Sequence, residues 1–272
     1  MTVCIAAACE SGKKIVVAAD RMFTFPYPTN LEFETEEKKI EELSKTWVAL
    51  ASGNTGYATE ILNNSRKKIC GFPKPEVAQI MSIVKEEYAT TRRANIDETI
   101  VRSTLGNDFI KFADRGMTLP AYLQSQANVY QQIIMLSQQL NLVVDIIIAG
   151  IDLSDAHISV VIHPGLLVSL DKLGYGAIGS GGIHATTYLS LHSQTSQSTL
   201  LNTLYSVYAA KKVSEVAPGV GRETDIAIIE TDRIVHCEKL VLTELEKLFS
   251  LSNNKPSPEL DTLEKLLEGK VE

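Results

Sequence analysis

A threonine at position 2 could act as a nucleophile that carries its own base. A threonine hydroxyl attacks weakly unless a neighbouring base removes its proton. If the initiator Met1 is removed, Thr2 supplies that base through its free α-amino group, which titrates near ~8. With Met1 retained, this amine is an amide and the base is lost. The alternative interpretation is a threonine that simply begins a β-strand, where threonine is common.

An acidic residue closes the second apolar run of the chain. Residues 2–9 and 15–19 are apolar on successive positions and flank a turn that contains Gly12. This pattern predicts a β-hairpin whose strands are buried on both faces. The second run ends at Asp20. Because an unpaired buried charge is costly, Asp20 must find a partner there.

The pattern of the rest of the sequence predicts separate blocks of strands and helices. We expect a loop over residues 25–35, which hold Pro26 and Pro28, and a helical pattern from 76 to 142 with breaks near 105–106 and 117–120. The other expected strands are 36–43, 46–51, 142–150, 157–162, 166–172, 224–230 and 233–237, and the other expected helices are 57–69, 183–191, 198–216 and 240–251.

This order of blocks favours an α+β fold over a doubly wound one. We expect a four-layer αββα sandwich of two antiparallel sheets with a helix layer outside each. With 272 residues, 44% of them hydrophobic, the chain can bury one core. We therefore expect a single domain over residues 1–251, with a helical expansion around 76–126 and a peripheral charged tail over 252–272.

Composition excludes several classes of function. The net charge of −7 leaves no basic face for nucleic acid. The apolar runs are shorter than a bilayer span, and the first residues lack the pattern of a signal peptide, so a cytoplasmic protein is expected. The four cysteines and five histidines show no metal-ligand spacing. We therefore expect no metal, no other cofactor and no disulfide.

Several short motifs occur in an order that resembles proteasome β subunits and their simpler bacterial relatives, which are N-terminal-nucleophile (Ntn) hydrolases. The likeness covers most of residues 2–229. The motifs are Thr2-Val3-Cys4-Ile5, residues 16–21 ending in Asp20-Arg21, Lys38-Lys39-Ile40, residues 51–58 around Gly53, residues 147–152 ending in Gly-Ile-Asp, Gly179-Ser180-Gly181-Gly182, and Ala209-Ala210-Lys211 through to Asp225.

The resemblance implies a catalytic group around Thr2. Thr2 would be the nucleophile and, through its amine, the base. Lys39 would stand beside the hydroxyl, favouring loss of its proton and keeping the amine neutral by like-charge repulsion. Asp20 would orient Lys39. Lys39 could instead be one more solvated charge, and a register shift of one residue would put Lys38 in its place.

Other positions would complete the site by the same resemblance. The backbone N–H of Gly53 would donate to the oxyanion, although a turn glycine with positive φ is the alternative. Ser180 would lie near the terminal amine, or would cap the following helix. Thr24 and Thr55 would line the substrate cleft, and the small Ala51 would form the base of the first specificity pocket, leaving room for bulky apolar side chains.

The late segment departs from the family pattern. Glu215 and Pro218 stand near the positions of the family's acidic residue and serine, so the serine is absent. Glu215, or Ser214, would take the part of the acid. The expansion around residues 76–126 would add helices that project from the helix layer.

The expected function is that of a threonine-type peptidase or amide hydrolase that forms an acyl-enzyme on Thr2. The alternatives are a catalytically inactive, proteasome-like structural subunit and a small-molecule amidase on the same fold. The expected partners are a peptide or protein substrate and further copies of this chain in a ring or related assembly. The sequence has no ATP-binding loop, so energy-driven unfolding would need a separate ATPase. No nucleic acid or membrane partner is expected.

Overall fold

A computed structural model describes residues 2–25, 31–35, 38–72, 74–103, 127–152 and 155–253. The chain divides into two compact units, residues 1–236 and 237–272. Helix α9 (Lys239–Asn253) falls in the second unit, so the division comes earlier than the expected boundary at residue 252. Among the described residues, no helix has both the length and the apolar character needed to cross a membrane.

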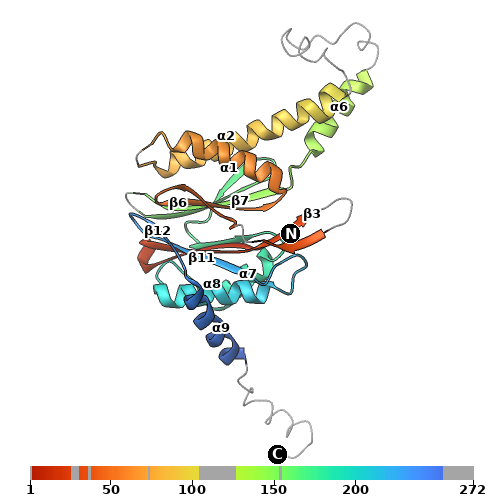
Figure 1. Cartoon of the computed structure of the whole chain (residues 1–272). Helices are drawn as coiled ribbons and strands as arrows, with labels where there is room; N and C mark the ends of the chain where they lie inside the picture. The colour runs from red at the N-terminus through yellow and green to blue at the C-terminus, as the bar shows by residue number, and fades with distance from the viewer. Residues whose placement is uncertain are drawn as a thin grey trace, which may run out of the picture. The chain divides into compact units, whose positions relative to one another are not determined.

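Two five-stranded antiparallel sheets form the centre of the first unit (Figure 1). One has the order β10-β1-β2-β11-β12 and the other β5-β6-β7-β8-β9. The strands of the first sheet are β1 (Cys4–Cys9), β2 (Lys14–Asp20), β10 (Tyr175–Ile178), β11 (Thr224–Ile229) and β12 (Ile234–His236). Those of the second are β5 (Ile40–Ser44), β6 (Trp47–Gly53), β7 (Val144–Ile151), β8 (Ala156–Ile162) and β9 (Leu166–Ser169).

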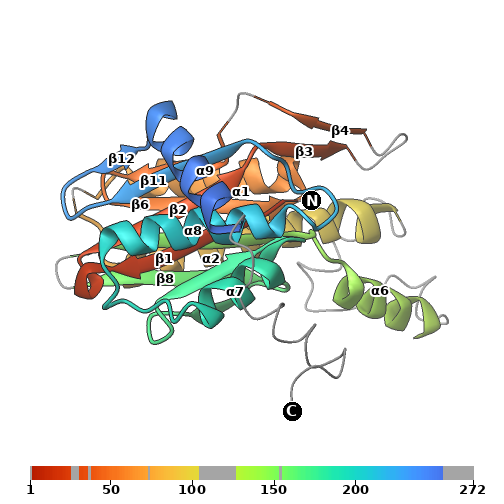
Figure 2. The same ribbon diagram turned by 90° about the horizontal axis from the view of Figure 1, so that it is seen from below.

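A layer of helices covers the outer face of each sheet. Helices α1 (Thr55–Ile69) and α2 (Val77–Ile96) lie over β6 and β7 (Figure 1). Helices α7 (Gly182–Leu191) and α8 (Leu200–Ser214) lie over β1 and β2 on the opposite side, as Figure 2 shows from below. The structure is therefore a sandwich of antiparallel sheets with helices on both outer faces, and this part of the fold prediction is confirmed.

Alternation along the strands builds two cores from the same apolar runs. In β6, Val48 and Leu50 pack between the two sheets, whereas Trp47 and Ala49 pack under α1 and α2. In β7, Ile147 lies in the core between the sheets and Ile148 lies under the helices. Successive side chains of a strand point to opposite faces, so strands covered on both faces are apolar throughout. Strands β1 and β2 are buried in the same way, so the prediction that residues 2–9 and 15–19 form strands buried on both faces is confirmed.

Two expectations about strands were wrong. Residues 25–35 are not a loop throughout, because β3 (Met22–Phe25) and β4 (Leu31–Glu34) pair as an antiparallel ribbon. The loop expectation rested on Pro26 and Pro28, which lie between β3 and β4 in the sequence and outside the described residues. Strand β10 was missed, since Gly174, Gly176 and Gly179 interrupt the apolar pattern that marks a strand.

The expected helical expansion is present in part. Helix α2 continues into the π-helical turn η2 (Asp97–Arg102), and α6 (Ala127–Gln139) leads back towards β7. Glu76 and Gln79 form a capping box that begins α2. In Figure 1 α6 and the end of α2 project beyond the sheets. The breaks expected near residues 105–106 and 117–120 lie outside the described residues.

Candidate active site

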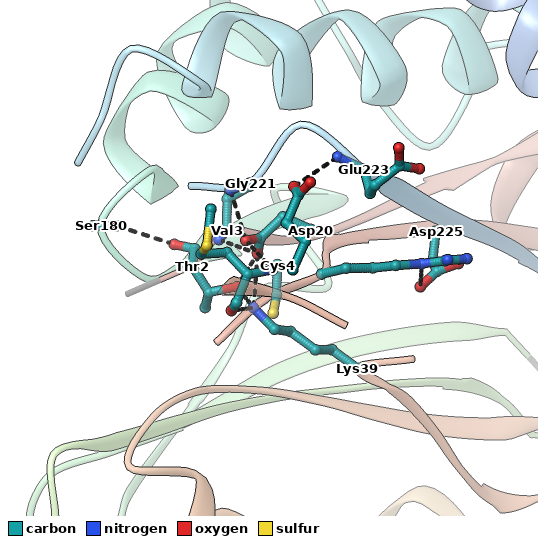
Figure 3. Close-up of polar contacts among 12 residues, drawn as sticks. Thr2, Val3, Cys4, Asp20, Lys39, Ser180, Gly221, Glu223 and Asp225 are labelled. Carbon is teal, nitrogen blue, oxygen red and sulfur yellow. Dashed lines mark hydrogen bonds and ion pairs between the residues drawn. The ribbon is translucent and has the colours of Figure 1, made fainter. Parts of the chain in front are cut away.

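Thr2 lies where the ends of three strands meet. It precedes β1, the strand that pairs antiparallel with β2 on one side and β10 on the other. The C-terminal ends of β2 and β10 therefore flank the N-terminal end of β1. This brings Asp20 beside Thr2 (Figure 3), and Gly179 lies on the other side. Thr2 is only 2% exposed, yet it lines a cleft.

Asp20 is a fully buried carboxylate that accepts five hydrogen bonds. Its Oδ1 accepts from the Thr2 hydroxyl, from the Val3 N–H at 3.0 Å and from Lys39 Nζ at 3.0 Å. Its Oδ2 accepts from the backbone N–H groups of Met22 at 3.0 Å and Gly221 at 2.9 Å. These donors offset the cost of burying the Asp20 charge. The expected partner of Asp20 is therefore found, as one cation and three backbone amides.

Lys39 brings its ammonium directly to the Thr2 hydroxyl. Its Nζ donates to Thr2 Oγ1, to Asp20 Oδ1 and to the backbone oxygen of Met22. The Lys39 side chain is 9% exposed, and its Nζ lies 5.3 Å from the centre of the Phe23 ring. Lys38 is exposed, so the register that puts Lys39 beside Thr2 is the correct one.

The turn after β10 holds the backbone of Thr2. The Ser180 hydroxyl lies 3.3 Å from the backbone oxygen of Thr2 and 3.0 Å from that of Pro218, and the N–H of Gly181 also donates to the Thr2 oxygen. Ser180 does not cap α7, whose cap residue Gly181 has no side-chain partner. The capping interpretation of Ser180 was therefore wrong, whereas its predicted proximity to Thr2 is found.

Gly179 allows this close approach, and we predict that Gly179→Ala displaces Thr2. The residue has φ of +87°, and an added Cβ would lie 2.2 Å from the backbone oxygen of Thr2. We expect a loss of unfolding free energy of about 2 kcal/mol or more, measured by chemical denaturation. Gly71→Ala is the matched control, because its Cβ would meet only Lys68 O at 3.5 Å. A Gly179→Ala protein as stable as the Gly71→Ala protein would contradict this account.

The cleft in front of Thr2 has a volume of about 100 Å³ and is open to solvent on one side. Ala51, Gly53 and Thr55 line it, as expected for cleft residues. The apolar part of the lining also includes Ala58 and Leu62, but Lys38 and Glu41 add charge. The Thr24 backbone belongs to β3, and its side chain lies outside the described part of the structure.

Gly53 ends β6 at the wall of this cleft. It has φ of +98°, and a Cβ there would lie 1.8 Å from Val143 O, so the turn itself demands glycine. The oxyanion interpretation and the turn interpretation are therefore compatible. Two backbone N–H groups at the start of the following helix are already bound. The Asn54 side chain accepts from the N–H groups of Gly56 and Tyr57 and caps α1.

The two late candidates do not contact Thr2 or Asp20 directly. Glu215 binds Lys211 at 2.7 Å and Lys212 at 3.0 Å. The Ser214 hydroxyl lies within hydrogen-bond distance of two backbone oxygens, that of Ala210 at 2.7 Å and that of Gly181 at 3.0 Å. Both residues therefore support the site indirectly. Ser214 contacts the turn that contains Ser180, and Glu215 begins the segment that contains Gly221.

Sequence reasoning missed the groups that contact the site through the backbone. The N–H groups of Val3, Met22 and Gly221, together with the carbonyl of Met22, supply four of its contacts. It also missed the Arg21–Asp225 ion pair, with contacts of 2.9 and 2.5 Å, which ties the end of β2 to β11. The Gly219-Val220-Gly221 spacing before β11 was the one available signal for a close backbone approach.

Cys4, two residues from Thr2, is not a competing nucleophile. Burial raises the pKa of the Cys4 thiol to about 12, and its Sγ lies 3.5 Å from Ala51 O. A thiol reacts as the thiolate, so Cys4 stays inert at neutral and mildly alkaline pH. We predict that iodoacetamide at pH 8 alkylates exposed Cys70 in the folded protein and leaves Cys4 unmodified, as peptide mass mapping would show. An adduct on Cys4 would contradict this.

No protein-family model matches the chain, and no curated protein matches it. The chemistry of the site must therefore be inferred from its own geometry.

Proposed function

We propose that this protein is a threonine-type amide hydrolase that acts on peptides through an acyl-enzyme on Thr2. The observation that carries the proposal is the contact of one buried hydroxyl with both an ammonium and a carboxylate, at the wall of a cleft. The sandwich of two antiparallel sheets between helix layers agrees with an Ntn-hydrolase fold, and the resemblance of the short motifs to proteasome β subunits supports the same class.

In the proposed reaction the α-amine of Thr2, liberated by removal of Met1, takes the hydroxyl proton. The oxygen attacks the scissile carbonyl carbon, the C–N bond breaks, and the leaving amine takes a proton from the Thr2 ammonium. Water then hydrolyses the ester and frees Thr2. Lys39 stabilises the negative charge that develops on Oγ1. Asp20 already accepts four other hydrogen bonds, so we assign it the orientation of the hydroxyl and of Lys39.

The cleft favours a peptide substrate with an apolar side chain next to the scissile bond. Ala51, Ala58 and Leu62 offer an apolar surface, and Gly53 leaves the backbone accessible at the cleft wall. An oxyanion donor at Gly53 would be worth a few kcal/mol of transition-state stabilisation, about 3 in comparable hydrolases.

A panel of fluorogenic peptide amides tests the proposal. Purified protein with a free Thr2 amine should hydrolyse a subset of the panel, with a burst of product equal to the enzyme concentration if deacylation limits turnover. Hydrolysis of small-molecule amides but of no peptide would favour the amidase alternative. No amide hydrolysis at all by protein with a free Thr2 amine would refute the proposal and leave the inactive structural subunit.

A further inference from the structure

A lysine in α8 is wholly buried behind the candidate site. The Lys211 side chain is 0% exposed, and its Nζ donates to Glu215 Oε1 at 2.7 Å and to Arg222 O at 2.7 Å. Desolvation lowers the pKa of the Lys211 ammonium, although Glu215 opposes the shift. An apolar side chain of similar length would avoid this desolvation cost, so the specific contribution of the ammonium is its directed hydrogen bonds.

Those two acceptors lie at opposite ends of one connecting segment. Residues 215–222 are all but the last residue of the connection from α8 to β11, and Lys211 Nζ binds the side chain of Glu215 and the backbone oxygen of Arg222. The segment's own backbone bonds are local turns, from Ala217 N to Ser214 O at 3.0 Å and from Val220 N to Ala217 O at 3.3 Å. These turns do not join the two ends, whereas Lys211 does.

Two residues between these ends, Pro218 and Gly221, contact the site. Gly221 N–H donates to Asp20 Oδ2 at 2.9 Å, and Pro218 O accepts from the Ser180 hydroxyl at 3.0 Å. Asp20 and Ser180 are the residues that hold the hydroxyl and the backbone oxygen of Thr2. The position of the segment is therefore linked to the position of Thr2.

We propose that Lys211 is a positioning residue: its ammonium clamps both ends of residues 215–222, so that Gly221 N–H and Pro218 O hold Asp20 and Ser180 against Thr2. The clamp is a property of the fold, and its effect on rate rests on the proposed chemistry of Thr2. Because the segment does not line the cleft, the clamp should affect the chemical step and not substrate binding.

Lys211→Met tests the clamp in the full-length protein. We expect kcat to fall about 10- to 100-fold, the effect of a small misplacement of reacting groups, while KM stays within about twofold. Amide hydrogen exchange at Gly221, followed by mass spectrometry, should become faster because the segment opens more easily. Lys212→Met is the matched control: the adjacent lysine binds the same carboxylate, and its replacement should leave kcat and Gly221 exchange near the parent values.

The outcomes separate this inference from the proposed function. Unchanged Gly221 exchange in folded Lys211→Met overturns the clamp, whether or not the parent hydrolyses peptides. Faster exchange with unchanged kcat in an active parent overturns the positioning role. If Lys211→Met does not fold, Glu215→Ala releases only the first end of the segment and should give a smaller fall in kcat with faster exchange. If kcat and Gly221 exchange in Glu215→Ala both equal those of the parent protein, the proposal is overturned.

Discussion

Thr2→Ala is expected to abolish peptide hydrolysis, lowering kcat by on the order of 10⁵-fold or more. The substitution removes the attacking oxygen, and no other described side chain in the site offers a replacement, since Cys4 is held as the neutral thiol. The measurement is hydrolysis of the best fluorogenic peptide by parent and variant purified side by side. The stability of the protein should change little, because Asp20 keeps its bonds to Lys39 and to three amides.

Thr2→Ser is the matched control for this experiment. It keeps both the hydroxyl and the α-amine on one residue, so it should still hydrolyse the fluorogenic peptide. If Thr2→Ala cleaves peptides as well as the parent, the nucleophile assigned to this site is wrong.

Lys39→Met is expected to reduce both activity and stability. The variant loses the cation beside Thr2 Oγ1, and we expect kcat to fall by about 10³-fold, the size found when a charge-stabilising donor is removed. It also leaves Asp20, which is fully buried, without its cation. Breaking a buried pair in this way costs about 3–5 kcal/mol of unfolding free energy, and the three amide donors to Asp20 favour the lower value. Denaturant unfolding and steady-state kinetics measure the two effects.

Two neighbouring substitutions make this test specific. Lys39→Arg keeps the charge and should recover stability more fully than kcat, because a planar guanidinium cannot reproduce the three directions of the ammonium. Lys38→Met removes an exposed charge and should change stability by less than about 0.5 kcal/mol. A large loss of stability in Lys38→Met together with none in Lys39→Met would contradict the observed register.

The apolar runs predicted the layers of the fold because burial on both faces leaves an unmistakable pattern. Residues 2–9 and 15–19 could be assigned to fully buried strands for that reason. Strand β10 was not predicted because glycines interrupt its apolar pattern, and the β3–β4 ribbon was not predicted because Pro26 and Pro28 suggested a loop. The position of β10 also depends on its pairing with β1, a distant segment of the chain, which local sequence does not encode.

The side chains of the site were easier to predict than its backbone donors. Asp20 at the end of an apolar strand required a partner, and the resemblance supplied Lys39. By contrast, every residue except proline carries an N–H, so the sequence did not single out Gly221 as a donor to Asp20. Lys211 gave no signal of its own, because a lysine near a helix end is usually solvated, and its burial depends on the packing of α8 against β1 and β2.

An inactive structural subunit is the main alternative to the proposed hydrolase. Pro218 stands near the position where the proteasome-like proteins that the motifs resemble have a serine, and its carbonyl accepts from Ser180. Ser180 and Gly221 nevertheless bind Thr2 and Asp20, so the loss of that serine does not leave Thr2 unsupported. The buried ion pair of Asp20 and Lys39 would be unnecessary in a purely structural role, where apolar residues fill space at lower cost.

Intact mass before and after treatment with a peptide epoxyketone tests the central claim most directly, because this reagent needs a hydroxyl and a free amine on the same residue. We predict that the purified protein lacks Met1 and gains one adduct, which peptide mapping assigns to Thr2. Protein that retains Met1 in every molecule, or that lacks Met1 and gains no adduct, would contradict the proposal that Thr2 is the nucleophile.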